Sequence, residues 1–248
     1  MPAIFFQQFW SIVGRDVTSF ALDVLNDGAN PGSINHTFIC LIPKKKKPKV
    51  AIDFRPISLS NVIYKIISKT IANRLKIILP NIIGKFQSAF VPGCLTTDNE
   101  LVAFESFHWM RKKKSGKKGR VGIKLDMTKA YDRIEWEFLI AVFNSMSFPK
   151  KWQSLALNCV SSVSFSMLLN GSPCQTFIPQ RGHCQGDPLS PYLFMICAEV
   201  FSGLLIKAQE EKVFQGWMQI KAVECHTKYL GLPAYLAAPS NKYLTSSR

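Results

Sequence analysis

The residue with the most chemical content in this 248-residue chain is Asp126. It ends a segment, residues 121–126, in which apolar side chains alternate with Gly122, Lys124 and Asp126 itself. This alternation predicts a strand that buries one face and shows the other. Asp126 would then stand at a strand end over a cleft, a place typical of a magnesium-binding carboxylate. A strand-end aspartate can equally be the N-cap of the next helix, so the metal interpretation requires a partner carboxylate.

A second segment with unusual residues is 185–191, Gln-Gly-Asp-Pro-Leu-Ser-Pro. Gly186 would let the backbone approach a ligand closely, because it has no side chain. Ser190 followed by Pro191 is a typical helix start, with a capping side chain and then a proline at the first helical position. The segment is therefore either only the start of a helix or a loop that lines a site.

The chain is strongly basic, with 31 Lys and Arg against 16 Asp and Glu and a net charge of +15. This balance favours a polyanionic partner, and nucleic acid fits better than a membrane face, because no basic amphipathic helix stands out. No membrane partner is expected, since the longest apolar stretch, 192–198, is far shorter than the roughly 20 residues of a bilayer span. Two basic runs, 44–47 and 111–120, are either solvated loops or nucleic-acid contacts. The candidate contacts are Lys44, Lys45, Lys46, Lys47, Lys112, Lys113, Lys114, Lys117 and Lys118.

The seven cysteines are an odd number and form no Cys-x-x-Cys pair, so the sequence predicts neither a disulfide framework nor a zinc site. The first residues contain no basic segment and no cleavage site of a secretion signal. We therefore expect an intracellular protein, in the nucleus or the cytoplasm, that is not secreted.

The elements that must position these residues begin with two extended segments, 36–42 and 49–54, joined by an exposed turn rich in lysine and proline. A helix follows Ser60, with Ile67, Ile71 and Leu75 on its apolar face, and Pro80 ends it. A second amphipathic helix starts at the capping-box spacing of residues 97–100. Its apolar residues are Leu101, Phe104, Phe107 and Met110.

Beyond Asp126 the sequence predicts helices over about 131–146 and 150–160. Asn170-Gly171 between two apolar runs is a strong signal for a β-hairpin, with strands over 164–169 and 173–178. A further helix starts at Ser190. Residues 213–248 show no clear period, and Glu224 has no flanking apolar strand. The pattern as a whole predicts an α+β fold.

Several blocks in this order resemble the reverse transcriptase of LINE-type non-LTR retrotransposons, the plant kind in particular. The resemblance covers nearly the whole chain and is specific because the blocks occur together. They are Asn35-His36-Thr37, Phe54-Arg55-Pro56-Ile57-Ser58-Leu59, Ala72-Asn73-Arg74-Leu75, Gln87-Ser88-Ala89-Phe90-Val91-Pro92-Gly93, Thr97-Asp98-Asn99, Leu125-Asp126 with Lys129-Ala130-Tyr131-Asp132, residues 185–194, and Lys228-Tyr229-Leu230-Gly231-Leu232-Pro233.

The resemblance implies a polymerase hand that copies RNA into DNA with an RNA template, a DNA primer, deoxynucleoside triphosphates and Mg²⁺. Asp126 would be the catalytic residue that binds the metal ions. Tyr131 would pack under the nucleotide sugar, and Arg55 would meet the triphosphate, for which a guanidinium is well suited. Gln185 and Gly186 would line the nucleotide and template side of the cleft. The lysine runs would hold phosphates without reading sequence.

The resemblance also shows a gap, because two metal ions about 3.5–4 Å apart normally need more than one carboxylate. The family supplies an adjacent Asp-Asp pair in a hairpin downstream of the helix after Gln185-Gly186. This chain contains no Asp-Asp pair, and its acids after Asp187 are Glu199, Glu210, Glu211 and Glu224. Residues up to about 221 resemble the stretch before that hairpin, whereas 223–233 resemble a stretch beyond it. We therefore expect an internal deletion that leaves the palm sheet incomplete.

Other positions depart from the family in the same direction. His183-Cys184 stands where the family usually has Leu-Arg, and Cys94 stands where it usually has Arg, so two cations are missing. The opening residues resemble the middle of a family block, which predicts a truncated start.

These observations predict polymerase fingers over 1–119, a partial palm over 120–222 and a C-terminal remnant over 223–248. The predicted function is that of a reverse transcriptase domain whose polymerase activity is lost with the Asp-Asp hairpin. The alternative is a non-catalytic nucleic-acid-binding module derived from such a domain. A fragment that does not fold stably is a third possibility.

Overall fold

The computed structural model describes residues 1–84, 87, 90, 91, 93, 95–112, 121–123, 129–211, 220–229 and 232–239. The chain forms two compact units, each assembled from two separate stretches of sequence. Unit 1 comprises Met1–Ile77 and Lys129–Phe194, and unit 2 comprises Ile78–Thr128 and Met195–Arg248. The predicted limits of the fingers (1–119) and the partial palm (120–222) are not tested by this division and stay a prediction.

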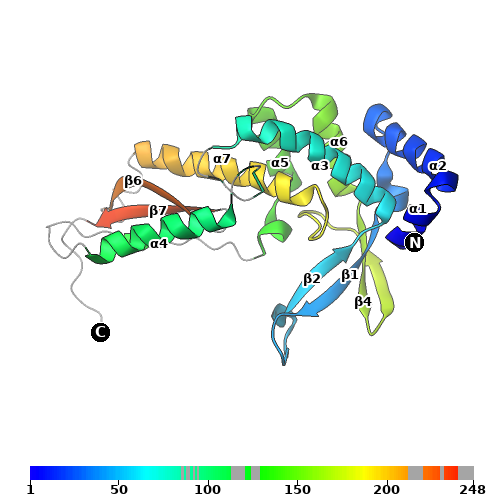
Figure 1. The fold of residues 1–248 in the computed structure, drawn as a ribbon, viewed down its shortest axis with the longest axis horizontal. Helices are drawn as coiled ribbons and strands as arrows, with labels where there is room; N and C mark the ends of the chain where they lie inside the picture. Colours follow the sequence, from blue (N-terminus) through cyan, green and yellow to red (C-terminus); the bar gives the residue numbers. More distant parts are fainter. Residues whose placement is uncertain are drawn as a thin grey trace. The chain divides into compact units, whose positions relative to one another are not determined.

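Unit 1 is built on a four-stranded mixed sheet with the strand order β2-β1-β4-β5. Strand β1 runs antiparallel to β2 and parallel to β4, and β4 runs antiparallel to β5. In Figure 1 the hairpin of β1 and β2 extends away from the helices of the unit. The strands are β1 (His36–Pro43), β2 (Phe54–Leu59), β4 (Ser164–Leu169) and β5 (Ser172–Phe177).

The helices of unit 1 bury one face each. Tyr64, Ile67 and Ile71 of α3 are almost fully buried, as are Leu139 and Phe143 of α5. The Tyr64 hydroxyl donates a 3.0 Å hydrogen bond to the Cys159 carbonyl of α6, so this buried polar atom is satisfied. The helices are α1 (Ala3–Gln8), α2 (Trp10–Leu22), α3 (Val62–Ile82), α5 (Trp136–Ser145), α6 (Lys150–Ser161) and α7 (Ser190–Glu210). Of α3 only the part up to Ile77, and of α7 only the part up to Phe194, belongs to unit 1. The short turns are the π-helical turn η1 (Asp23–Asp27) and the 3₁₀ turns η2 (Pro31–Ile34), η3 (Ala51–Asp53) and η4 (Ala130–Arg133).

The predicted hairpin after α6 is confirmed. Strands β4 and β5 are joined by Asn170 and Gly171, whose φ angles are 51° and 81°. Two consecutive positive φ angles are what a two-residue hairpin turn needs, and Asn-Gly is the residue pair that adopts them most readily.

Three predicted boundaries were wrong. Residues 49–54 are not a strand, because the chain turns through η3 there and β2 begins only at Phe54. Pro80 does not end α3, which continues to Ile82 because the N–H of Ile83 still reaches the Leu79 carbonyl. The predicted helix over 131–146 is a 3₁₀ turn followed by the shorter helix α5.

Unit 2 contains the end of α3, helix α4 (Thr96–Lys112), the rest of α7 and a three-stranded antiparallel sheet. Helix α4 begins at Thr96, one residue before the predicted capping box of 97–100, and the Asp98 carboxylate accepts the N–H of Leu95. Its predicted apolar face is not buried, because Leu101, Phe104 and Phe107 are all at least half exposed.

The sheet of unit 2 has the strand order β3-β7-β6, with β3 (Val121–Ile123), β6 (Ile220–Tyr229) and β7 (Leu232–Pro239). The expectation that Glu224 lacks a flanking apolar strand was wrong, because Glu224 lies within β6, which pairs with the largely apolar strand β7. The pairing of β6 with β7 shifts register between Val223 and His226, and such an irregularity hides the two-residue period from sequence inspection.

Helix α7, over Ser190–Ala208, is long and apolar enough to cross a membrane. Core helices have the same length and composition, and the side chains of Leu193 and Ile196 are fully buried within the chain. The absence of a membrane partner therefore stays our expectation.

Candidate functional site

The segment that precedes α7 is fastened to strand β2. The backbone N–H of Ser58 donates a 2.9 Å hydrogen bond to the Gln185 carbonyl. Gly186 has a φ angle of +110°, and a Cβ atom at this position would lie 3.0 Å from the Ser58 carbonyl oxygen. Only glycine combines this backbone conformation with so close an approach. The close contact between β2 and the loop therefore depends on Gly186.

The other end of the same loop is fastened to the segment that contains Tyr131. The N–H of His183 donates to the Tyr131 carbonyl at 3.0 Å, and the N–H of Gly182 donates to the Ile134 carbonyl at 2.8 Å. The indole N–H of Trp136 donates to the Gly182 carbonyl at 3.1 Å. The loop thus connects β2 to η4 through main-chain hydrogen bonds, which hold position independently of side-chain rotamers.

The ring of Tyr131 stacks on Phe194, the fifth residue of α7. The ring centroids are 5.1 Å apart and the planes are inclined by 24°. Burial raises the pKa of the Tyr131 phenol, so it stays neutral at physiological pH. The ring is only half-buried, and its accessible part is available to contact a ligand.

Arg55 lies on β2 opposite Ile42 of β1, and its side chain is exposed. Three of the predicted nucleotide-binding positions therefore belong to unit 1 and to one connected framework: Arg55 on β2, Gln185 hydrogen-bonded to β2, and Tyr131 hydrogen-bonded to the same loop. The framework residues Ser58, His183 and Phe194 were not predicted. Ser58 and Phe194 had a signal as members of the blocks 54–59 and 185–194, and His183 had one as a departure from the family pattern.

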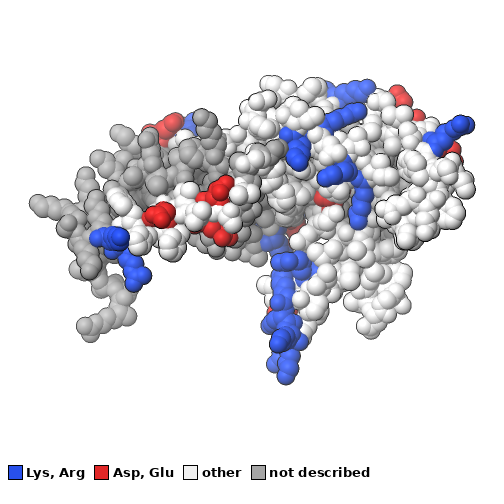
Figure 2. Space-filling model, in the orientation of Figure 1, with Lys and Arg blue, Asp and Glu red and all other residues white. Residues whose placement is uncertain are grey.

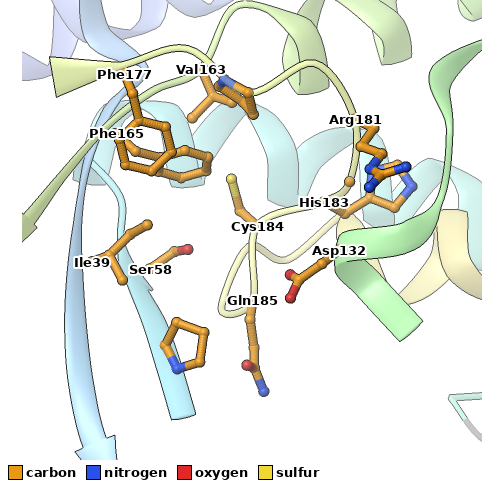
Figure 3. Close-up of a pocket in the computed structure, with 13 residues that line it drawn as sticks. Ile39, Ser58, Asp132, Val163, Phe165, Phe177, Arg181, His183, Cys184 and Gln185 are labelled. Atoms are coloured by element: carbon orange, nitrogen blue, oxygen red, sulfur yellow. The ribbon is translucent and has the colours of Figure 1, made fainter. Parts of the chain in front are cut away.

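A cavity of about 240 Å³ opens between this loop and the four-stranded sheet. One part of its lining is apolar, because Val163, Phe165 and Cys184 form a buried cluster against which Ile39 packs. Figure 3 shows the rings of Phe165 and Phe177 together in this part, with the Cys184 sulfur pointing toward them. The polar lining comes from Ser58, Asp132, Arg181, His183 and Gln185.

His183 and Cys184 contribute no charge to the cavity. Burial lowers the pKa of the His183 imidazole to about 4 and raises the pKa of the Cys184 thiol to about 12. Both side chains are therefore neutral at pH 7. Neither ring nitrogen of His183 has a hydrogen-bond partner in the described part of the chain.

Asp187 bears on the two interpretations of residues 185–191, the start of a helix or a loop that lines a site. Its Oδ2 atom accepts hydrogen bonds from the N–H groups of Leu189 and Ser190 and from the Ser190 hydroxyl, at 3.0 to 3.2 Å. Burial raises the pKa of this carboxyl, and the hydrogen bonds act against that rise. Asp187 caps α7, whereas Gln185 lines the cavity and Gly186 lies against Ser58 of β2, so the segment starts a helix and also contributes to the cavity lining.

The first basic run lies at the tip of the β1–β2 hairpin. Lys44, Lys45, Lys46 and Lys47 are all exposed there, and blue side chains follow this hairpin in Figure 2. Of the second run, Lys112 is the exposed last residue of α4. The predicted contacts Lys113, Lys114, Lys117 and Lys118 lie outside the described residues.

Asp126, the predicted metal ligand, also lies outside the described residues. Within the described ranges no group of three or more His, Cys, Asp or Glu side chains is placed to hold a metal ion. The donor set on these residues therefore does not fit a two-metal centre, which needs several carboxylate oxygens around ions about 3.5–4 Å apart.

Comparison with known proteins gives a family match. The family model described as reverse transcriptase (RNA-dependent DNA polymerase) matches residues 42–221. The chain is 31% identical over 208 residues to the uncharacterised 149 kDa protein of transposon TX1 from Xenopus laevis, which covers 82% of the chain and 15% of that protein. It is 29% identical over 174 residues to the Pol polyprotein of a type-2 retrotransposable element from Drosophila melanogaster, again covering 15% of the relative and 67% of the chain.

Among solved structures, the chain is similar to apo telomerase from Candida tropicalis truncated from its C-terminal domain. The match has a TM-score of 0.47 and 15% sequence identity, and it covers 85% of this chain and 44% of the other. The chain thus spans only a small part of the curated relatives that it matches.

Proposed function

Because the chain belongs to the reverse transcriptase family and is a reverse transcriptase domain of a non-LTR retroelement, we propose that it binds a template–primer and a nucleotide without completing nucleotide transfer. The observation that supports binding is the loop that joins Arg55's strand to Gln185 and Tyr131. The observation against turnover is the sequence itself, which contains no Asp-Asp pair.

In this proposal each framework residue has a physical role. The exposed guanidinium of Arg55 pairs with phosphate oxygens of the incoming nucleotide. Tyr131, backed by Phe194, offers a flat surface to the sugar. Gln185 lies beside β2 and lines the nucleotide and template side. These residues bind and orient, and orientation alone contributes only part of a polymerase's rate.

The missing step is the stabilisation of charge as the new bond forms. In this family bound Mg²⁺ ions activate the primer hydroxyl and stabilise the leaving pyrophosphate. Asp126 is the candidate ligand for them, but one carboxylate does not supply the oxygens of a two-metal site. The chain is therefore not expected to complete a metal-dependent step.

We also propose a fold, an origin, partners and a cellular location for this domain. The fold is a polymerase hand of the plant LINE type, with fingers over 1–119, a partial palm over 120–222 and a remnant over 223–248. An internal deletion near residue 222 removed the palm hairpin. The partners are an RNA template and a DNA primer, without a membrane, and the protein acts inside the cell in the nucleus or the cytoplasm.

The second candidate function is a nucleic-acid-binding module without a nucleotide site. The exposed lysines at the tip of the β1–β2 hairpin favour it, because they require no chemistry beyond phosphate binding. The two candidates differ in whether the next complementary nucleotide strengthens template–primer binding.

That difference is measurable by fluorescence anisotropy with a labelled RNA–DNA template–primer, in Mg²⁺, with and without the next complementary deoxynucleoside triphosphate. We expect the complementary nucleotide to tighten binding and a mismatched one not to. Arg55→Gln and Gln185→Ala should remove the gain, whereas Arg15→Gln on α2 removes an exposed guanidinium elsewhere in unit 1 and should retain it. Binding that ignores the nucleotide would favour the module without a nucleotide site.

A further inference from the structure

The lysines at the tip of the β1–β2 hairpin do not have equivalent surroundings. We propose that Asp53 divides them into two classes. Lys45 forms an ion pair with Asp53 that fixes the loop, whereas Lys46 and Lys47 contact nucleic-acid phosphates. This inference rests on the proposed template–primer binding and assigns residues to it.

Asp53 is the last residue of η3 and lies directly before β2. Its Oδ1 atom is 2.8 Å from the Lys45 ammonium. Its Oδ2 atom accepts hydrogen bonds from the backbone N–H groups of Lys49 at 2.8 Å and Val50 at 3.2 Å. One carboxylate therefore holds both sides of the turn, and its own side chain is only one-tenth exposed.

Lys44 is held at the same turn. Its N–H donates to the Asp53 carbonyl at 2.7 Å, and its ammonium donates to the Ile52 carbonyl at 3.1 Å. Lys44 thus has part of its donor capacity engaged. Lys46 and Lys47, in contrast, are exposed and have neither an ion pair nor a hydrogen bond from their ammonium groups within the described part of the chain.

The charges explain why this difference affects binding. The Lys45 side chain is hydrogen-bonded to Asp53, which lowers the pKa of that carboxyl, so Asp53 remains a carboxylate at neutral pH. A phosphate that binds Lys45 must compete with this carboxylate at 2.8 Å and is repelled by it. Lys46 and Lys47 carry no such compensation. They can neutralise phosphates and release counterions.

The ligand is the phosphodiester backbone of a nucleic-acid strand, recognised by charge without base contacts. Either the RNA template or the DNA primer can present this chemistry. A hairpin fixed by Asp53 presents Lys46 and Lys47 at a defined place, which reduces the ordering cost of binding compared with a loose loop.

The test measures the salt dependence of binding by the full chain with three probes: a single-stranded RNA, a DNA duplex and an RNA–DNA template–primer. Each phosphate contact contributes about 0.7 to 0.9 to the slope of log affinity against log salt. We expect the double variant Lys46→Gln with Lys47→Gln to lower the slope by about 1.4 to 1.8. Lys45→Gln, matched in chemistry and in the same turn, should lower it by less than about 0.3. The probe that shows these differences identifies the strand.

Asp53 variants separate positioning from charge. In Asp53→Asn the side-chain amide oxygen can still accept the two backbone N–H groups, but the ammonium of Lys45 is released, so this variant should steepen the slope toward one additional contact. Asp53→Ala loses the backbone hydrogen bonds as well and should weaken binding at every salt concentration. Lys45→Gln in the Asp53→Asn background should abolish this steepening of the salt slope. If Asp53 had only a structural role, Lys45→Gln would not reverse the effect of Asp53→Asn.

The results that would overturn the inference are distinct from failure of the proposed function. Equal slope changes for Lys45→Gln, Lys46→Gln and Lys47→Gln, in variants with unchanged thermal melts, would refute the two classes while leaving nucleic-acid binding intact. Absence of any salt-dependent binding by the unmodified chain would refute both.

Discussion

The backbone N–H of Ser58 lies 2.9 Å from the Gln185 carbonyl oxygen, and this hydrogen bond joins two parts of the chain that are far apart in sequence. Ser58 belongs to the strand that carries Arg55, and Gln185 belongs to the loop that reaches Tyr131 at its other end. Three of the four predicted nucleotide contacts, Arg55, Gln185 and Tyr131, thus lie on segments that main-chain hydrogen bonds hold together. Changes at this junction should affect ligand binding even where no ligand-contacting side chain is altered.

Gly186→Ala should destabilise unit 1 and weaken nucleotide-dependent binding. The added Cβ would lie 3.0 Å from the Ser58 carbonyl, at a φ angle of +110° that other residues rarely adopt. We expect a loss of about 1–3 kcal/mol in the free energy of unfolding, measured by urea denaturation. Gly28→Ala is the control, because Gly28 has a φ angle of +74° and no atom within 4 Å of the added Cβ. Equal losses in both variants would show that contact with Ser58 is unimportant.

Tyr131→Phe should preserve the support that Phe194 gives, whereas Tyr131→Ala should remove it. The stacked pair, with centroids 5.1 Å apart, is worth about 0.5–1.5 kcal/mol beyond burial. A double-mutant cycle with Phe194→Ala, read by urea denaturation, should give a coupling energy of that size for Tyr131→Ala. Tyr131→Phe keeps the ring contact, so its free-energy change should add to that of Phe194→Ala, with a coupling energy near zero. If Tyr131→Phe costs as much as Tyr131→Ala, the hydroxyl matters more than the stack.

His183→Leu should stabilise the chain, and the gain should grow as the pH falls. At neutral pH the change removes two buried ring nitrogens that lack partners in the described residues, worth about 1–3 kcal/mol. Burial lowers the pKa of His183 from 6.5 to about 4, so between these values the unfolded chain binds more protons than the folded one. The His183 contribution is therefore intact above pH 6.5 and is lost as the pH falls to about 4.

The full acid effect is about 3 kcal/mol, because each unit of pKa shift corresponds to about 1.4 kcal/mol. Asp187 acts with the opposite sign, since burial raises the pKa of its carboxyl and acid relieves that penalty. The quantity to measure is therefore the difference in unfolding free energy between the unmodified chain and His183→Leu at pH 7, 6, 5 and 4. A difference that does not change with pH would mean that His183 is not buried.

The sequence predicted those features that depend on neighbouring residues. Asn170-Gly171 marked the β4–β5 hairpin because its positive φ angles are a local property of that residue pair. The sequence predicted an extended segment over 49–54 and therefore missed the start of β2. The Asp53 side chain accepts hydrogen bonds from the backbone N–H groups of Lys49 and Val50, and these bonds hold the chain in a turn before β2. Side-chain caps of this kind leave no hydrophobic period.

The candidate site was predictable as a set of residues but not as an arrangement. The blocks around Arg55, Tyr131 and Gln185 predict nucleotide contacts, and this role stays a prediction. Neither the Ser58–Gln185 hydrogen bond nor the Tyr131–Phe194 stack follows from periodicity, because each pairs residues from distant parts of the chain. The apolar residues of α4 show the opposite failure, since their spacing predicted a buried face that Phe104 and Phe107 do not have.

Primer extension by the full chain on an RNA template, with a DNA primer, all four deoxynucleoside triphosphates and Mg²⁺, tests most directly whether binding is retained without turnover. We expect the template–primer to be bound and no nucleotide to be added, with the same result for Asp126→Ala. Incorporation by the unmodified chain that Asp126→Ala abolishes would contradict this conclusion, because it would show that Asp126 still works within a complete metal site.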